Sequence, residues 1–178
     1  MAMSLEQASY LSQIIGSLAV LASLVFVGLQ IRQNTKSQKN VAVDSLSGAI
    51  AAINVPAMES AALGEALSKA TKDWGSASRE QRIMAHYFLF SYFKLAENAW
   101  YQRKANVLDE MQFAGWATGV RMFFHSPGVQ DAWWPRRCNH YSPEFQSYLA
   151  ATAPPPSESG TLDDLFDNVS KSATSDEN

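Results

Sequence analysis

The chain has 178 residues, a formal net charge of -3 and a single cysteine, Cys138. This length is enough for one small domain with its own hydrophobic core. The charge balance lacks the basic excess with which proteins bind nucleic acid, so we expect no nucleic-acid partner, and one cysteine excludes an internal disulfide bond.

The first element is a stretch without charged side chains, from Gln7 to Ile31. Its apolar part, residues 10–31, would form a helix about 33 Å long at about 1.5 Å per residue, and a hydrocarbon core is about 30 Å thick. The sequence therefore predicts one transmembrane helix over 10–31, with residues 1–9 outside the membrane. A cleaved signal peptide has a basic start and a core of about 7–15 apolar residues, whereas the only charged side chain before this segment is Glu6. A buried helix of a soluble protein stays as the alternative, because five side chains lower the hydrophobicity: Ser12, Gln13, Ser17, Ser23 and Gln30.

Basic residues follow this helix directly, at Arg32, Lys36 and Lys39. Positively charged flanks of membrane helices stay in the cytoplasm. We therefore expect the N-terminus outside, the rest of the chain inside, and membrane lipid as a partner.

Small and polar residues recur along one side of the predicted membrane helix. Small residues let two helices approach closely, and Ser and Gln side chains can donate hydrogen bonds across the contact. The pattern favours docking against another membrane helix, in a homo-oligomer or a larger complex, although such residues are also common in membrane helices that dock on nothing. The residues of this seam are Ser12, Gly16, Ala19, Ser23 and Gln30.

Residues 32–55 are predicted to continue the membrane helix as a stalk. Apolar residues recur there at three- and four-residue steps, which is typical of an amphipathic helix. Asn54-Val55-Pro56 should end it, because the residue before a proline avoids the helical region. The apolar positions are Val41, Ala42, Leu46, Ala49, Ile50 and Ile53.

A helical domain is predicted over residues 56–152. Ser78 with Gln81 and Asp109 with Gln112 have the form of capping boxes, which open helices, and Ser-Pro pairs at 126–127 and 142–143 place proline where a helix tolerates it. No alternating apolar run bounded by turn residues occurs, so the fold class is all-α. The expected helices cover 57–72, 79–104, 110–124, a short segment after Pro127 that stops at Pro135, and 144–151.

Residues 153–178 form a Pro-rich linker and an acidic tail, in which Lys171 is the only base. This composition predicts a flexible segment. The apolar residues within 162–166 could fold onto a partner as a helical turn, and the alternative is a solubilising tail without a partner.

Glu97 is the most informative charged residue of the domain, because it lies among Phe93, Trp100 and Tyr101 on a helix. An isolated buried carboxylate is very costly, so we expect an ion pair, with Arg121 as the partner. An exposed Glu97, or a Glu97 with a ligand-binding or acid–base role, are the alternatives.

Residues that could hold a metal or act as nucleophiles are few: His86, His125, Cys138 and His140. The Cys138-x-His140 spacing is too short for a structural zinc site, and no second Cys-x-x-Cys occurs. No serine-hydrolase, phosphate-loop or zinc-protease motif is present. We therefore expect no metal, no cofactor and no enzymatic activity.

Aromatic residues are dense between positions 87 and 134. At helical spacing they are expected to form the core, and the alternative is a pocket between helices that holds a flat or lipidic ligand. The run Trp133-Trp134-Pro135-Arg136-Arg137 could instead contact a bilayer surface.

Four segments carry a resemblance to a known group of proteins. They are 15–35, which ends in Gln-Ile-Arg-Gln-Asn-Thr, 95–102 (Leu-Ala-Glu-Asn-Ala-Trp-Tyr-Gln), 126–134 (Ser-Pro-Gly-x-x-x-x-Trp-Trp) and 141–145 (Tyr-Ser-Pro-Glu-Phe). The chain resembles, over about residues 10–150, a widespread group of uncharacterised bacterial proteins with one N-terminal membrane helix and a small helical domain. The resemblance implies a location in the bacterial inner membrane but no activity.

Together these patterns predict a single-pass, membrane-anchored interaction protein, an accessory or scaffold subunit of a membrane complex or a homo-oligomer. A membrane-anchored ligand-sensing domain with an aromatic pocket is the alternative, and an enzyme is the third.

Overall fold

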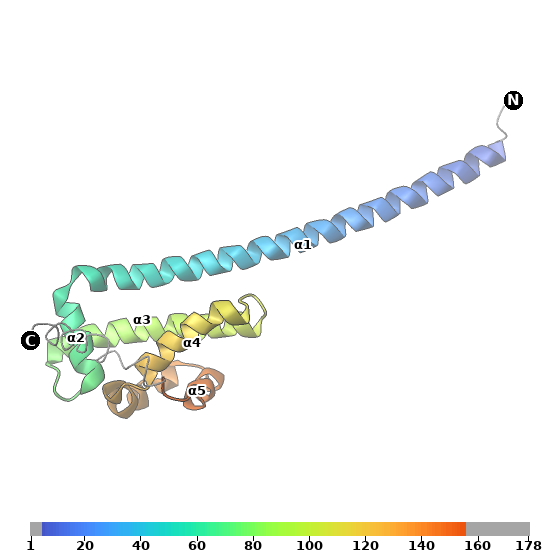
Figure 1. The fold of residues 1–178 in the computed structure, drawn as a ribbon. Helices are drawn as coiled ribbons and strands as arrows, with labels where there is room; N and C mark the ends of the chain where they lie inside the picture. Colours follow the sequence, from blue (N-terminus) through green and yellow to red (C-terminus); the bar gives the residue numbers. More distant parts are fainter. Residues whose placement is uncertain (1–4, 156–178) are drawn as a thin grey trace, which may run out of the picture. The chain divides into compact units, whose positions relative to one another are not determined.

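The computed structural model describes residues 5–155, and the chain is helical throughout this range apart from short turns (Figure 1). The predicted all-α fold is confirmed. The expected flexibility of the tail beyond Pro155, and the apolar island at 162–166, fall outside the described residues and stay predictions. Two compact units divide after Ala42, Met1–Ala42 and Val43–Asn178.

Helix α1 spans Leu5–Glu59, and its side chains from Ser12 to Ile31 are exposed. Among the described residues it is the one helix long and apolar enough to cross a membrane by length and composition. The predicted apolar helix at the N-terminus is thus confirmed as a helix.

The end of α1 differs from the prediction. The helix passes through Pro56 and ends at Glu59, and α2 covers Ala61–Lys72. Proline disfavours the helical region for its neighbour without forbidding it, and so close to the end of a helix it removes only one hydrogen bond. The break falls instead at Ser60, whose hydroxyl accepts a hydrogen bond from the backbone N–H of Leu63 at 3.2 Å and caps α2.

Both predicted capping boxes are present. Ser78 and Gln81 open α3, Arg79–Lys104, and Asp109 and Gln112 open α4, Glu110–Phe124. Ser142 caps α5, Pro143–Ala150, by accepting a hydrogen bond from the N–H of Phe145. Between α4 and α5 the chain makes one turn of π-helix and two of 3-10 helix: η1 Gly128–Trp133, η2 Trp134–Arg136 and η3 Cys138–His140.

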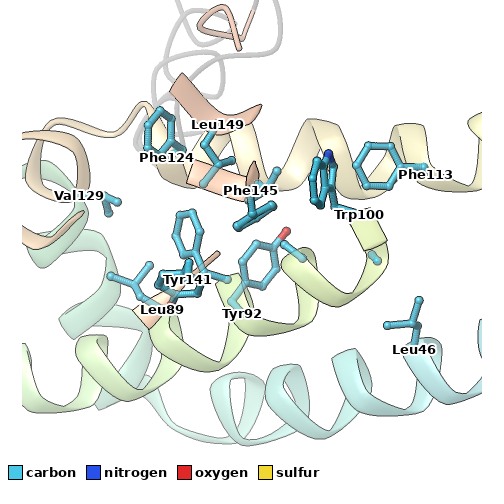
Figure 2. Packing of buried hydrophobic residues seen from close by; sticks show 14 of the residues in the cluster. Leu46, Leu89, Tyr92, Trp100, Phe113, Phe124, Val129, Tyr141, Phe145 and Leu149 are labelled. Carbon is cyan, nitrogen blue, oxygen red and sulfur yellow. The ribbon is translucent and has the colours of Figure 1, made fainter. Parts of the chain in front are cut away.

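Helix α3 carries the centre of the core. Leu89 of α3 is fully buried, as are Phe145 and Leu149 of α5 (Figure 2). Phe93 of α3 is fully buried as well. Leu46 of α1 is 3% exposed and joins the same cluster. Its burial explains why the compact unit begins at Val43, inside the expected 32–55 stalk, rather than at residue 56.

Gly128 marks the closest approach of two elements. A Cβ atom there would collide with the carbonyl oxygen of Ala70 and would lie 2.9 Å from that of Thr71. Only glycine lets η1 pack so closely on the last turn of α2. This contact fixes the segment that carries Trp133, which is 2% exposed.

Candidate interaction surfaces and polar clusters

Two serine hydroxyl groups of the predicted membrane helix donate hydrogen bonds to backbone carbonyls of the same helix. Ser17 Oγ donates to the carbonyl oxygen of Gln13, and Ser23 Oγ to that of Ala19, both at 2.9 Å. These bonds satisfy polar groups that would be costly in lipid. Gly16 has open space where a Cβ would stand. The residues of the predicted seam are therefore on an accessible surface of α1: Ser12, Gly16, Ala19, Ser23 and Gln30.

The basic flank is exposed. Arg32, Lys36 and Lys39 follow one another at steps of four and three, so they share one face of α1. The next acidic residue along the chain is Asp44. This face can therefore meet an anionic surface without a competing carboxylate on the same turns.

Glu97 is nearly buried and paired, as expected, but its partner differs. Its Oε2 accepts a hydrogen bond from Lys94 Nζ at 2.9 Å, and its Oε1 accepts one from the backbone N–H of Ser142 at 2.7 Å. The predicted pair with Arg121 is wrong, because Arg121 donates to the carbonyl oxygens of Ala153 and Pro154. Lys94 lies three residues before Glu97, a spacing at which helical side chains meet, so the signal was present in the sequence.

Two opposing effects set the pKa of Glu97. Burial alone would raise it, but the hydrogen bonds from Ser142 and Lys94 outweigh burial, and the pKa lies below its ordinary value. Lys94 also donates to the carbonyl oxygen of His140 and lies 4.5 Å from the centre of the Tyr141 ring. This cluster joins α3 to the start of α5, so its role is structural.

The end of the described chain lies on α4. Arg121 holds the carbonyl oxygens of Ala153 and Pro154 at 2.9 and 3.1 Å. His125 Nε2 and Thr152 Oγ1 are 3.1 Å apart. Burial lowers the pKa of His125 against the hydrogen bond with Thr152, which raises it, and the charge of Arg121 lowers it further. Arg121 thus fixes the point from which the tail leaves the domain.

His86 serves the core. Its Nδ1 accepts a hydrogen bond from the indole N–H of Trp133 at 3.1 Å. Burial lowers the pKa of His86, and the charges of Arg137 and His140 lower it further. Since an indole N–H only donates, Nδ1 must be unprotonated in the folded state.

The other candidate ligands do not gather. Among residues 5–155, no group of three His, Cys, Asp or Glu side chains could hold a metal ion. Cys138 Sγ lies 3.9 Å from the carbonyl oxygen of Pro135, and the His140 ring meets Phe90 edge-on at 5.7 Å.

In the run 133–137, burial argues against a bilayer contact for Trp133, whereas Trp134 is partly buried and Pro135 and Arg136 are exposed. Trp133 lies in the core, and Trp134 stacks on Tyr141 at 5.1 Å between ring centres.

An outer groove of about 330 Å³ lies in the domain, between the last part of α1 and α4. No charged side chain lines it. Tyr92 of α3 forms part of its wall and is only 8% exposed. The sequence did not point to this groove, because it is lined by three separate segments of the chain, 47–54, residue 92 and 112–116. Its lining residues are Ser47, Ile50 and Asn54 of α1, Tyr92 of α3, and Gln112, Gly115 and Trp116 of α4.

No protein-family model, curated protein sequence or solved structure matches the chain.

Proposed function

We propose that this chain is a single-pass, membrane-anchored interaction protein, an accessory or scaffold subunit of a membrane complex or homo-oligomer. It lies in the bacterial inner membrane with its N-terminus outside and its helical domain in the cytoplasm. The observation that carries the proposal is the uninterrupted exposure of apolar side chains around α1.

This exposure is found on every side of the helix. Val20, Leu21 and Phe26 lie about 100° or more apart around α1, and each is about 60% exposed. A helix that packs on a soluble partner is apolar on one side only. Lipid surrounds a membrane helix, so such a helix is apolar on all sides. If α1 were surrounded by water, its exposed apolar surface would be far larger than the apolar patches on monomeric soluble proteins.

Orientation rests on the basic face formed by Arg32, Lys36 and Lys39. These residues follow the apolar segment directly, and positive flanks remain cytoplasmic. An anionic inner leaflet would attract the same face.

An interaction role is supported by how the domain uses its polar groups. Glu97, His86 and His125 each bond to other parts of the domain. The core is filled by aromatic and aliphatic side chains, and the groove beside α1 lies on its outside. Such an arrangement suits a rigid body that presents surfaces to a partner.

Fractionation of cells that express the full-length chain tests the anchor. We expect the chain in the membrane fraction and resistant to alkaline extraction. The double variant Leu21→Arg and Leu24→Arg should move to the soluble fraction, because charges at the centre of a membrane helix cost about 2.5–3.5 kcal/mol each. The matched double variant Leu21→Ile and Leu24→Ile should stay in the membrane. A soluble wild-type chain would overturn the proposal.

Orientation and partners need two further measurements. Cytoplasmic and periplasmic reporters fused after Ala153 should give activity only with the cytoplasmic one. Purification in mild detergent, followed by crosslinking, should recover either a homo-oligomer or a defined membrane partner. A monomer without a partner would remove the interaction role and leave only an anchored domain.

A further inference from the structure

One wall of the outer groove carries a tyrosine hydroxyl that bonds to no other part of the described chain. The Tyr92 side chain is 8% exposed, and within residues 5–155 its hydroxyl makes no hydrogen bond. The oxygen lies against Gly119, one turn along α4 from Gly115, which also lines the groove. Figure 2 shows Tyr92 among the core residues, with its hydroxyl at the end of the ring that faces away from α3.

The position of this hydroxyl is fixed by its surroundings. The Tyr92 ring packs on Phe123 at 4.7 Å and stacks on Phe88 at 6.2 Å between ring centres. Burial raises the pKa of Tyr92 to about 12, so the phenol stays protonated at neutral pH. The hydroxyl oxygen is not among the fully buried polar atoms without a partner, so it reaches solvent and can donate to a bound molecule.

Other hydrogen-bonding side chains line the same groove. Gln112 Oε1 is occupied by the backbone N–H of Asp109, which leaves the Gln112 amide N–H groups to donate. In the described part of the chain, the side chains of Ser47, Asn54 and Trp116 make no hydrogen bond. Each of these side chains also carries a donor.

Apolar side chains complete the site. Ile50 and Trp116 are partly buried at its edges. At Gly115 a Cβ would meet nothing within 4 Å, so the backbone of α4 is bare beside the groove. The volume lies at the lower end of the range for small-molecule sites, about 300–1,000 Å³.

We propose that this groove binds a small, uncharged, planar ring that carries an oxygen acceptor, with Tyr92 donating to that oxygen and Trp116 and Ile50 packing on the ring. The absence of charge in the lining selects a neutral ligand, since a carboxylate would lose its hydration without gaining a cation. The site belongs to the domain alone, so it does not depend on whether α1 crosses a membrane.

Benzamide and benzoate are matched probes, because they share a shape and differ in charge. The full-length protein in mild detergent is titrated with each, and the indole N–H signals of the tryptophans are followed by NMR, with Trp116 assigned through Trp116→Phe. We expect benzamide to shift the Trp116 signal saturably with a Kd on the order of 1 mM. Benzoate should bind at least about tenfold more weakly.

Three variants locate the binding. Tyr92→Phe removes the hydroxyl without breaking a protein hydrogen bond and should weaken benzamide about three- to tenfold. Gly115→Leu fills the groove and should abolish the shift. Gly64→Leu is the control, because position 64 is equally open but lies on α2, away from the groove, and it should bind like the wild type.

Each outcome of these titrations supports or refutes the proposed binding site. No saturable shift of Trp116 with benzamide, or equal binding of benzamide and benzoate, would overturn the proposal. So would undiminished binding in Gly115→Leu. A loss in Gly115→Leu together with unchanged affinity in Tyr92→Phe would refute the role of the hydroxyl. Dispersion of the remaining tryptophan signals reports whether each variant is folded.

Discussion

The hydroxyl oxygen of Tyr92 lies directly against the Cα of Gly119, so that α3 and α4 meet through a phenol and a bare backbone. A Cβ at position 119 would collide with this oxygen but would lie 3.7 Å from the ring carbon Cζ. The closeness of the contact therefore depends on a single oxygen atom, and it can be tested by changing either Gly119 or Tyr92.

Gly119→Ala should destabilise the wild-type domain by about 1–3 kcal/mol through overpacking. In the Tyr92→Phe background the same change should become neutral or stabilising by up to about 1 kcal/mol, because alanine favours a helix and the obstacle is gone. Urea unfolding followed by tryptophan fluorescence measures both, since all five tryptophans lie in the domain. An equal effect of Gly119→Ala in the two backgrounds would contradict the contact.

Glu97 should couple to Lys94 and not to Arg121. Glu97→Ala is expected to lower the free energy of unfolding by about 1–3 kcal/mol, because it strands the N–H of Ser142. With Lys94→Ala the double-mutant cycle should show a coupling of about 0.5–1 kcal/mol, since Lys94 is 40% exposed at its side chain. With Arg121→Ala the losses should add within about 0.5 kcal/mol. A strong coupling of Glu97 to Arg121 would restore the pair expected from the sequence.

Gly128→Ala should be one of the most damaging small substitutions in the domain. The new methyl group would meet the backbone carbonyls of Ala70 and Thr71, which cannot turn aside as a side chain would. We expect a loss of about 1–3 kcal/mol in urea unfolding. Gly64→Ala, where the space is open, should be neutral or slightly stabilising. Similar stability of the two variants would show that η1 and α2 are not in close contact.

Acid should weaken the domain through two histidines. Burial lowers the pKa of His86 and of His125, so each gains a proton less readily in the folded state than when unfolded. Their contribution is present above about pH 6.5, the ordinary histidine value, and is lost as pH falls through the lower folded pKa. His86→Gln should reduce the fall in unfolding free energy between pH 7.5 and 5, and the double variant with His125→Gln should reduce it further. A pH dependence equal to that of the wild type would refute this assignment.

The seam of α1 should matter only if the helix docks on another. Gly16→Leu should lower crosslinking to the partner about threefold or more, because close packing carries contacts between membrane helices. Val20→Leu, which lies off the seam, is the matched control. If both variants crosslink like the wild type, α1 is only an anchor.

Local signals in the sequence predicted the helices well. The capping boxes at Ser78 and Asp109 need only residues three positions apart, so their geometry is set by neighbours along the chain. The extended reach of α1 through Pro56 was missed because the proline rule states a preference. The burial of Leu46 depends on α1 reaching the distant helices of the domain, which periodicity alone does not reveal.

Contacts between residues far apart in the sequence are the part of the site that the sequence predicts poorly. The sequence favours Arg121 as the partner of Glu97 because it is a cation on another apolar helix, yet the carbonyls that Arg121 binds lie 32 and 33 residues further on. Lys94 was available at helical spacing. The groove beside Tyr92 joins three separate segments, and no pattern within any one of them indicates it.

The burial of Phe145 and Leu149 in the core also sets an order of events during synthesis. Both side chains are fully buried against the centre of the domain, so the core cannot close until the ribosome has released α5. At about 5–20 residues per second, translation from Ile31 to Leu149 takes roughly ten seconds. During that interval the apolar part of α1 has already been synthesised. The aromatic residues of α3 stay exposed to solvent until α5 can pack on them. Targeting of the nascent chain would therefore precede folding of its domain, and chaperones have a defined window in which to shield α3.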